Sequence, residues 1–589
     1  MYIEKIDSPK DLKKLSIAEC DKLAEEIREA LLKKASLKGG HLSSNLGLVE
    51  ATIALHYVFD SPKDKIIFDV SHQCYTHKIL TGRRLAFTDE KSYGLANGYT
   101  NPDESEHDYF RVGHTATSIS LASGLAKARD LKGSDENVIA VIGDGSLSGG
   151  EAFEGLDFAA TEIEGNLTVV FNDNQMSIAE NHGGIYKSLS ELRESNGKSN
   201  NNLFKSLGYE YYFVKDGNNI QDVVNALNEV KGKRKRSLIH ICTVKGKGYQ
   251  YAEENQERTH WVRPFDIKTG VEKEQINSER YDIIIRDYLL DKMKNDPKVV
   301  TMIAAVPDAL SFKKEYRDMA GKQFIDVGIA EEHAISMSAG LAKNGCKPVF
   351  ATMSTFFQRT YDQISQELCI NKLSATLLVV NASVYASNDV THIGIFDIPM
   401  MSNIPNLVYL APTNKQEFIA MLDWSIEQQT HPVAVRAPRN GVFNSKYAVD
   451  KDYGELNKYK LVVDGEKVAV LALGDFFQMG EELCELIRKE FNFTPTLINP
   501  RYITGLDIEL LTELKNKHGL IISLEDGVLD GGFGQKIAGF YGNKNVNVLN
   551  YGLKKEFLDR YDVNEVLERN HLKPELIIED IKKLQQFQI

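Results

Sequence analysis

Short runs rich in β-branched residues alternate along this chain with longer segments of helical spacing, and this alternation constrains the fold most. Clear strand-like runs are NVIAVIG (137–143) and KPVFATM (347–353), and helical spacing marks residues 331–344 and 413–428. Further strand-like runs lie at 167–172, 237–244, 298–306, 375–380, 407–412, 468–474, 494–500 and 520–526. Strands that alternate with helices form βαβ units, whose strands pair in parallel. The pattern therefore predicts an α/β protein with mainly parallel sheets.

Two polar stretches divide the pattern. They lie at 266–280 (DIKTGVEKEQINSER) and 442–460 (VFNSKYAVDKDYGELNKYK) and are typical of linkers. We therefore expect three consecutive α/β domains, at 1–270, 271–450 and 451–589. A further polar segment, SELRESNGKSNNN (190–202), is interpreted as a loose insertion.

Composition excludes several classes of protein. The chain has 70 basic and 83 acidic residues, a net charge of −13, which argues against general binding to nucleic-acid phosphates. The six cysteines are scattered, without the spacing of a zinc site or a disulfide framework, so we expect a reducing compartment. The start, MYIEKIDSPKDLKKL, lacks the apolar core of a signal peptide, and no apolar run is long enough to span a membrane. These features predict a cytoplasmic protein.

A candidate phosphate and metal site follows the strand NVIAVIG. Gly143, Asp144 and Gly145 lie where this strand ends and a helix is expected to begin, and Asn174 ends the next strand thirty residues later. In parallel sheets this carboxyl edge binds ligands, and a helix N-terminus favours anions. Either tight turn alone is ordinary in an α/β protein. Together, a carboxylate, an amide oxygen and the Met176 carbonyl form an oxygen donor set suited to Mg²⁺ or Ca²⁺ shared with phosphate.

Several longer blocks resemble one enzyme family. They are GGHLSSNLGLVEATIALHYVFDSPKDKIIFDVSHQCYTHKILTGRR (39–84), VGHTATSISLASGLAKARDLKG (112–133), VGIAEEHA (327–334), STFFQRTYDQ (354–363), THIGIFD (391–397) and APRNG (437–441). With GDG and NDN, they resemble the 1-deoxy-D-xylulose-5-phosphate synthase family, which is transketolase-like. The resemblance implies a homodimer with a diphosphate, a pyrimidine and a C-terminal domain. It also implies thiamine diphosphate and Mg²⁺ as cofactors, and pyruvate and glyceraldehyde 3-phosphate as substrates.

The resemblance also implies how the cofactor is held. Glu331 would hydrogen-bond the aminopyrimidine ring and promote proton removal from the thiazolium carbon, whereas by position alone it is a carboxylate favouring a helix N-terminus. Burial would raise its pKa. Phe356 would stack on the pyrimidine, with Phe357 as the core residue. Other predicted cofactor contacts are His72, Gly113, His114, Thr115, Gly143, Asp144, Gly145, Ser146, Asn174, Met176 and Lys245, among which Asp144, Asn174 and Met176 would bind the metal.

The acceptor side of the site is predicted from matching histidines and arginines. His41, His260 and His392 are the expected proton donors or acceptors, although a lone histidine is more often structural. Arginine forks suit phosphate oxygens. The predicted substrate contacts are Arg359, Tyr361, Asp389, His392 and Arg439.

Departures from the family pattern gather on this acceptor side. Met353 stands where family members have tyrosine, Asn381 where they have arginine, and Asn388 where they have an acidic residue. Ser383, Ala386 and Asn440 stand where they have glycine. Asp389 lies one place beyond the acidic position. The alternatives to the synthase are therefore a related carboligase that joins pyruvate to a different aldehyde, a transketolase, and a cofactor-binding scaffold without turnover.

Overall fold

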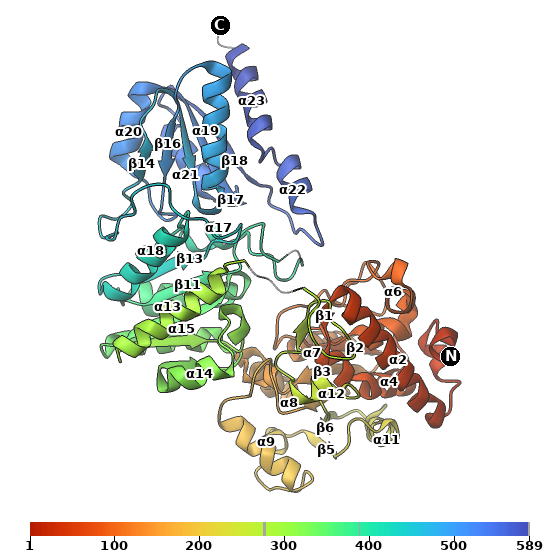
Figure 1. The fold of residues 1–589 in the computed structure, drawn as a ribbon. Coiled ribbons are helices and arrows are strands. Elements are labelled where there is room, and N and C mark those ends of the chain that lie inside the picture. Colours follow the sequence, from red (N-terminus) through yellow and green to blue (C-terminus); the bar gives the residue numbers. More distant parts are fainter. Residues whose placement is uncertain (275–277, 388, 587–589) are drawn as a thin grey trace. The chain divides into compact units, whose positions relative to one another are not determined.

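The computed structural model describes residues 1–274, 278–387 and 389–586 (Figure 1). The chain folds into two compact units. Unit 1 comprises Met1–Asn277 with Gly328–Ala330, and unit 2 comprises Ser278–Val327 with Glu331–Ile589. Among the described residues, no helix is both long and apolar enough to cross a membrane.

Unit 1 is built on a five-stranded sheet in which all neighbours are parallel. The strand order is β2-β3-β4-β6-β5. The strands are β2 (Lys65–Phe68), β3 (Val138–Gly143), β4 (Leu167–Asp173), β5 (Glu210–Val214) and β6 (Arg236–Cys242). Successive side chains of each strand point to opposite faces, so the sheet supplies two hydrophobic cores. Ile66 and Phe68 pack into one core and Ile67 into the other.

Helices cover both faces of this sheet. Residues of α2, α4 and α11 share the core that holds Phe68, and residues of α7 and α8 share the core that holds Ile67. The helices are α1 (Pro9–Leu12), α2 (Ile17–Lys38), α3 (Ser43–Gly47), α4 (Val49–Val58), α5 (Tyr75–Lys78), α6 (Leu85–Thr88), α7 (Ser118–Lys132), α8 (Gly150–Glu162), α9 (Gly184–Glu194), α10 (Leu203–Leu207), α11 (Ile220–Val230) and α12 (Gln250–Glu254).

Unit 2 contains two sheets. The first is fully parallel, with order β12-β13-β11-β10-β8-β9. Its strands are β8 (Val299–Ile303), β9 (Phe324–Asp326), β10 (Lys347–Met353), β11 (Thr376–Val380), β12 (Val408–Leu410) and β13 (Val433–Arg436). The second has order β14-β16-β15-β17-β18 and is parallel except for its antiparallel edge strand β14. Its strands are β14 (Lys460–Val463), β15 (Lys467–Ala472), β16 (Thr496–Asn499), β17 (His518–Val528) and β18 (Asn547–Leu553).

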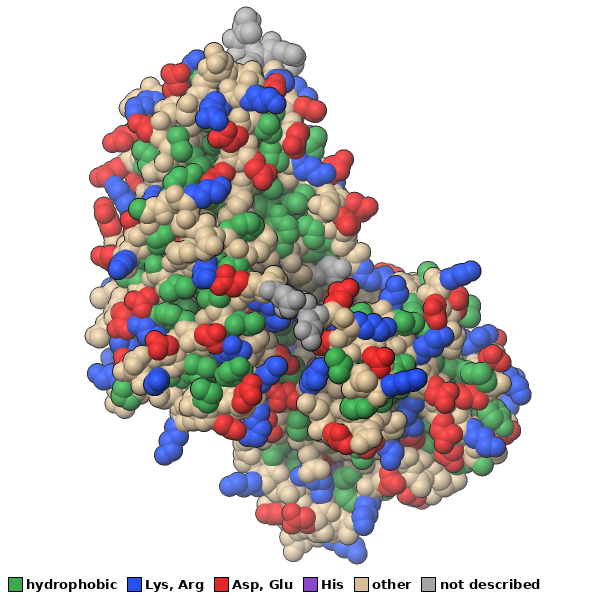
Figure 2. All heavy atoms as spheres, viewed as in Figure 1, with side chains coloured by type: hydrophobic (Ala, Val, Ile, Leu, Met, Phe, Trp, Pro, Cys, Tyr) green, Lys and Arg blue, Asp and Glu red, His purple; other side chains and the backbone are tan. Residues whose placement is uncertain are grey.

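One hydrophobic core joins these two sheets, because buried residues of both, such as Phe350 and Ile521, belong to it. The helices of unit 2 are α13 (Tyr281–Asn295), α14 (Lys314–Ala320), α15 (Glu331–Lys343), α16 (Tyr361–Gln363), α17 (Asp397–Met401), α18 (Lys415–Glu427), α19 (Phe477–Phe491), α20 (Ile508–Lys517), α21 (Phe533–Tyr541), α22 (Val563–Arg569) and α23 (Pro574–Gln586). Lys and Arg side chains are interspersed with Asp and Glu on the visible face of each unit, without a large basic patch (Figure 2).

These sheets confirm the predicted fold class, which is an α/β protein with three mainly parallel sheets in succession. Each strand-like run named from the sequence forms a strand. The prediction of a loose insertion at 190–202 is partly wrong, because α9 extends to Glu194 and its Leu192 is buried in the unit 1 core. The domain boundaries at 270/271 and 450/451 stay a prediction.

Candidate active site

The predicted metal turn lies on two neighbouring strands of unit 1. β3 and β4 pair in parallel, with Gly143 opposite Asn172, and the Asp144 amide donates to the Asn172 carbonyl at 3.0 Å. Asp144 and Asn174 therefore lie at one edge of the sheet, as expected if the strands are adjacent. The helix begins later than predicted, because a 3₁₀ turn (Gly145–Ser148) precedes α8.

Asp144 is a buried carboxylate that favours a cation. Its side chain is 1% exposed, and Asn181 Nδ2 donates to Oδ2 at 2.9 Å. Burial and the nearby Asp173 carboxylate raise the pKa of Asp144 to about 7, against the opposing effect of Lys245. The Asn174 side-chain oxygen accepts the Met176 amide at 3.2 Å, which fixes the following turn. The donors at this edge are carboxylate and amide oxygens, so the set fits Mg²⁺. Sequence reasoning missed Asn181, which no short motif indicates.

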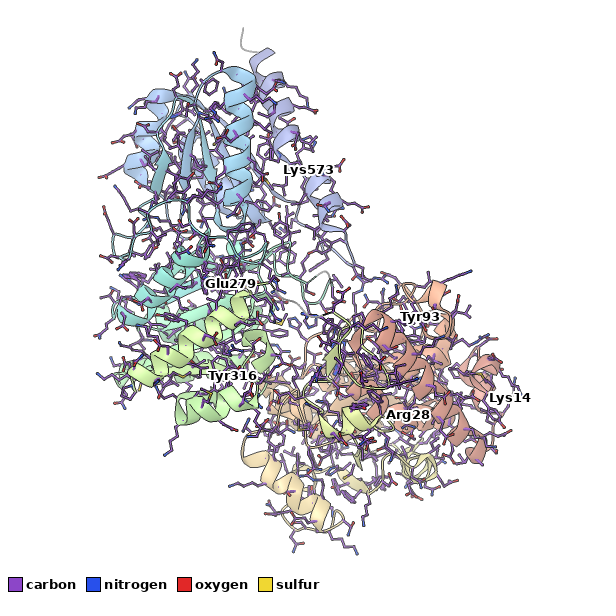
Figure 3. All side chains as sticks on the ribbon, in the orientation of Figure 1. Lys14, Arg28, Tyr93, Glu279, Tyr316 and Lys573 are labelled. Atoms are coloured by element: carbon purple, nitrogen blue, oxygen red, sulfur yellow. The ribbon has the colours of Figure 1, made fainter. Side chains whose placement is uncertain are left out.

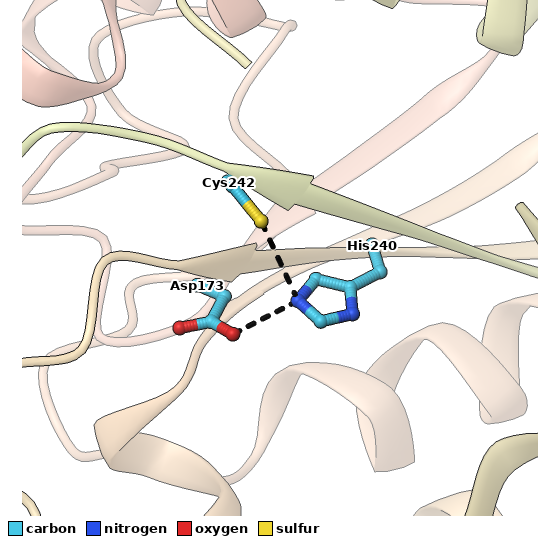
Figure 4. A group of neighbouring side chains, drawn as sticks. All are labelled: Asp173, His240 and Cys242. Carbon is cyan, nitrogen blue, oxygen red and sulfur yellow. Dashed lines mark hydrogen bonds and ion pairs between the residues drawn. The ribbon is translucent and has the colours of Figure 1, made fainter. Parts of the chain in front are cut away.

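A buried polar group, drawn in Figure 4, lies directly before Asn174. Asp173 Oδ2 is 2.9 Å from His240 Nε2 and 2.6 Å from Arg193 Nη1, and Cys242 Sγ is 4.0 Å from the same histidine nitrogen. The residues Asp173, His240 and Cys242 could hold a metal by type and spacing. However, Oδ2 already meets both Arg193 and His240, and a metal there would have to expel the arginine. We interpret the group as a structural network that anchors the Asn174 turn.

Lys245 is buried rather than solvated. It is 2% exposed and its ammonium group donates to the Ser177 carbonyl. Burial lowers the pKa of Lys245 to about 8, with Asp144 acting in the opposite direction. Asn218 fixes Val244, the residue before Lys245, because the Asn218 Oδ1 accepts the Val244 amide at 2.9 Å.

Asn218 is itself held from α2 and α4. Its Nδ2 donates to Glu50 Oε2 at 3.0 Å, and Glu50 pairs with Arg28 of α2, which is labelled in Figure 3. These contacts fix the backbone next to Lys245, in the same unit as Asp144.

Three of the predicted histidines come together in unit 1. A two-stranded antiparallel ladder, β1 (Gly40–His41) with β7 (Trp261–Val262), pairs His41 with Trp261 and so brings His41 beside His260. The His41 ring centroid is 5.0 Å from that of His72 and 5.5 Å from that of His260. The Tyr99 ring, which sequence reasoning missed, is 5.7 Å from His41. Burial, with Lys245 and the other two histidines nearby, lowers the pKa of His260 well below its usual value, so this imidazole is neutral.

Gly113, His114 and Thr115 lie in the turn that leads into α7. The adjacent Ala116 has a φ of 70° and is buried. Asp69, which directly follows β2, fixes this turn by accepting the Ala116 amide at 2.9 Å.

In unit 2, Glu331 is the first residue of α15 and is 3% exposed. No described residue donates a hydrogen bond to its Oε2, and Arg359 Nη1 is 3.7 Å away. Burial raises the pKa of Glu331 to about 7, although Arg359 opposes the rise. A buried carboxyl oxygen without a hydrogen-bond donor fits a ligand that supplies one, as an aminopyrimidine ring would. Arg359, predicted to bind a substrate phosphate, lies here beside Glu331.

His392 lies against Phe356 in the same unit. The two ring centroids are 5.7 Å apart, with the rings nearly perpendicular, and the neighbouring Phe357 is fully buried in the core, as expected. Thr391 Oγ1 is 2.8 Å from His392 Nδ1 and donates to Asp389 Oδ1 at 2.6 Å. Burial raises the pKa of Asp389, but His392 and Thr391 overcome this and leave it below the usual value.

The remaining predicted substrate contacts are more dispersed. Tyr361 is 42% exposed, and its hydroxyl donates to Asn403 Oδ1 at 2.8 Å. The Arg439 side chain is exposed, and its amide donates to the Asp475 carboxylate at 2.9 Å. Asn381 and Ser383 have φ of 53° and 96°, a region that favours glycine. Asn388 lies outside the described residues.

Comparisons with known proteins agree along the whole chain. The family model described as 1-deoxy-D-xylulose-5-phosphate synthase matches residues 3–202, that for the transketolase pyrimidine-binding domain matches 282–443, and that for the transketolase C-terminal domain matches 457–577. A 1-deoxy-D-xylulose-5-phosphate synthase of Caldanaerobacter subterraneus subsp. tengcongensis is 38% identical, with 98% of each chain covered. The chain belongs to the 1-deoxy-D-xylulose-5-phosphate synthase family. The predicted family is thereby confirmed.

Other family relatives are similarly related. The synthase of Clostridium tetani is 35% identical over 98% of both chains, and that of Alkaliphilus oremlandii is 38% identical over 99% of both. Among solved structures, the transketolase of Campylobacter jejuni covers 97% of this chain and 100% of its own at 16% identity, with a TM-score of 0.44. The pyrimidine-binding domain model, which spans Glu331, Phe356 and His392, implies thiamine diphosphate as the cofactor of this family member.

Proposed function

We propose that the chain joins pyruvate to glyceraldehyde 3-phosphate with loss of CO₂, giving 1-deoxy-D-xylulose 5-phosphate, with thiamine diphosphate and Mg²⁺ as cofactors. The observation that carries this proposal is the 35–38% identity to synthases of this name over at least 98% of both chains. The test is to supply purified protein with both cofactors and pyruvate and to measure CO₂ and the ketose phosphate after the aldehyde is added. Absence of the ketose phosphate would refute the proposal.

Asp144, Asn174 and the Met176 carbonyl would hold Mg²⁺, with Lys245 close enough to act electrostatically on Asp144. Bound thiamine diphosphate supplies the carbon nucleophile and accepts the electrons released by decarboxylation. Glu331 would share its carboxyl proton with the aminopyrimidine ring, and its pKa of about 7 suits both giving and taking that proton near neutral pH. Phe356 would pack against the ring.

The histidines would handle the protons of the substrates. Burial and its cationic neighbour Lys245 hold the pKa of His260 well below its usual value, so this neutral imidazole can accept a hydrogen bond but resists protonation. His41 lies within ring contact of both His260 and His72. In unit 2, the Asp389–Thr391 pair orients His392, which would donate to the oxygen of the acceptor aldehyde.

A second candidate function is a carboligation of pyruvate with a different aldehyde. The loop from 381 to 392 contains no Lys or Arg, and Arg359 lies beside Glu331. Losing a charged hydrogen bond to a phosphate costs about 1.5–3 kcal/mol, or roughly tenfold to a hundredfold in affinity. Saturation by glyceraldehyde 3-phosphate at micromolar levels would exclude this candidate, whereas a preference for an unphosphorylated aldehyde would support it.

The same assay separates the remaining alternatives. Turnover only with a ketose phosphate as donor would identify a transketolase. Tight cofactor binding without turnover of any donor would identify a scaffold.

The six cysteines are all free thiols, which supports a reducing, cytoplasmic location.

We also propose a homodimer formed through α7 and α8. These helices pack against each other in unit 1. They leave Leu131 81%, Phe153 48% and Phe158 47% exposed. Large exposed apolar side chains favour burial against a second copy. Replacing Phe158 with Asp should shift the protein from dimer to monomer in sedimentation velocity, and a wild-type monomer would contradict the assignment.

A further inference from the structure

Two turns in unit 1 have backbone conformations that are costly for their residues. Val70 and Ser71 have φ of 57° and 67°, and Ala116 has a φ of 70°. A β-branched residue at positive φ is a true outlier, and such strain persists only where the surroundings hold it. The first turn leads directly to His72, and the second follows His114 and Thr115. The strain therefore occurs beside predicted cofactor contacts.

Asp69 connects these two turns. It follows the last residue of β2, is 1% exposed, and its amide donates to the Val141 carbonyl of β3 at 2.8 Å. Its Oδ1 accepts the Ala116 amide at 2.9 Å, and its Oδ2 accepts the Ser118 amide at 3.0 Å. Each carboxylate oxygen thus fixes a different backbone group at the start of α7.

Further contacts tie the same turns together. Ser71 Oγ donates to the Val112 carbonyl at 2.8 Å and accepts the Thr100 amide at 2.9 Å. Burial raises the pKa of the Asp69 carboxyl, and the nearby Ser146 hydroxyl, from the turn that follows Asp144, opposes this rise. A Cβ atom added at Gly149 would lie 2.6 Å from the Ala116 Cβ, so the glycine lets the segment before α8 pack closely against the Ala116 turn.

We propose that Asp69 is a positioning residue that couples the His72 turn and the 113–116 turn into one cofactor-binding wall. The inference rests on the proposed function, because it takes thiamine diphosphate as the ligand of that wall. Asp69 acts through its neighbours and need not touch the cofactor. An asparagine at this position keeps the shape but turns one acceptor into a donor that faces a backbone N–H, so one of the two ties is lost.

The matched control is Asp64, at the opposite end of the same strand. It is 2% exposed, its Oδ1 accepts the Asn137 amide at 2.7 Å, and its Oδ2 accepts the Asp60 amide at 2.7 Å. Like Asp69, Asp64 is buried and accepts a backbone hydrogen bond at each of its two carboxylate oxygens. It lies at the amino end of β2, however, whereas the candidate site lies at the carboxyl ends of the strands. A merely structural role would make the two substitutions equivalent.

The experiment compares full-length wild type, Asp69→Asn and Asp64→Asn by calorimetric titration with thiamine diphosphate at saturating Mg²⁺. We expect Asp69→Asn to raise the Kd about tenfold to a hundredfold and Asp64→Asn to change it less than about twofold. Both variants should lose similar thermal stability. The apparent cofactor constant of Asp69→Asn in the turnover assay should rise more than kcat falls.

Equal Kd values for wild type and Asp69→Asn would overturn the proposal, as would an equal rise in both variants. If wild type itself does not bind thiamine diphosphate, the proposed function fails and this inference fails with it, which is a distinct result. If Asp69→Asn does not fold, Ser71→Ala removes a tie between the same turns without changing charge. That variant should raise the Kd about threefold to tenfold, and an unchanged value would overturn the coupling.

Discussion

The predicted site residues of unit 1 and of unit 2 are held in different ways. In unit 1, Asp144 and Lys245 are buried and each makes a hydrogen bond to a neighbouring turn. In unit 2, Glu331 is equally buried, yet its Oε2 accepts no hydrogen bond from a described residue. Hydrogen bonds to neighbouring turns fix the geometry of a buried side chain, whereas a buried carboxyl oxygen without a donor is costly until a ligand supplies one. We therefore propose that the unit 1 residues serve binding and that Glu331 of unit 2 takes part in proton transfer.

The largest effect is expected from a substitution of Glu331 in unit 2. Replacing Glu331 with Gln removes the titratable proton while keeping the side-chain shape, so kcat should fall about 10²–10⁴-fold. Thiamine diphosphate should still bind, because unit 1 is unchanged. Glu332→Gln, in the same first turn of α15, is the matched control and should keep near-normal turnover. Near-normal turnover of Glu331→Gln would refute the assignment of this residue.

The corresponding change in unit 1 should act on binding instead. Asp144→Asn removes the charged oxygen of the metal set, so Mg²⁺ affinity should fall by more than about 100-fold. Asn181→Ala removes only a group that orients Asp144 and should cost about tenfold. Titration of Mg²⁺ in the presence of thiamine diphosphate measures both. Similar losses in the two variants would show that Asp144 orients the site rather than binding the ion.

The contrast between the units also explains what the sequence could reveal. Long β-branched runs such as β3 and β10 were predicted because burial on both faces leaves a continuous apolar signature. Strands that were not predicted include the half-exposed β5, the three-residue β9 and the edge strand β14. Their short or mixed patterns resemble loops.

Site residues follow the same logic. Asp144 and Asn174 were predicted because they end consecutive strands, and parallel pairing places such residues at one edge. The contact between His41 and His260 depends on a ladder between segments about 220 residues apart, which no local pattern encodes. Asp69 accepts hydrogen bonds from two backbone amides at the start of α7, and Asn181 donates one to Asp144. Both partners are distant in the sequence, so residue type and spacing gave no signal for either residue.

A smaller effect concerns pH. The pKa of Glu331 is raised by burial from 4.5 to about 7, so the folded cofactor-free protein binds this proton more tightly than the unfolded chain does. The contribution of Glu331 to stability is therefore complete below about pH 4.5 and is lost as pH rises through 7. Glu331→Gln lacks this titration, so its stability relative to wild type should rise by roughly 1–3 kcal/mol between pH 4.5 and 8. Thermal melting of both cofactor-free proteins measures the difference, in which the shared Asp144 titration cancels. A difference independent of pH would contradict the raised pKa.

The smallest effect tests the half-buried part of unit 2. Asp389 orients Thr391 and His392, and its replacement by Asn removes the charge but keeps one acceptor for the Thr391 hydroxyl. Because the interaction is partly exposed, we expect the KM for the aldehyde to rise only about twofold to tenfold, with the Kd for thiamine diphosphate unchanged. Asp362→Asn, an exposed carboxylate of α16, should leave both values unaltered. A large loss of cofactor binding in Asp389→Asn would mean that this loop supports the cofactor and not the acceptor. Cofactor binding would then depend on residues of both units, which would contradict the contrast between them.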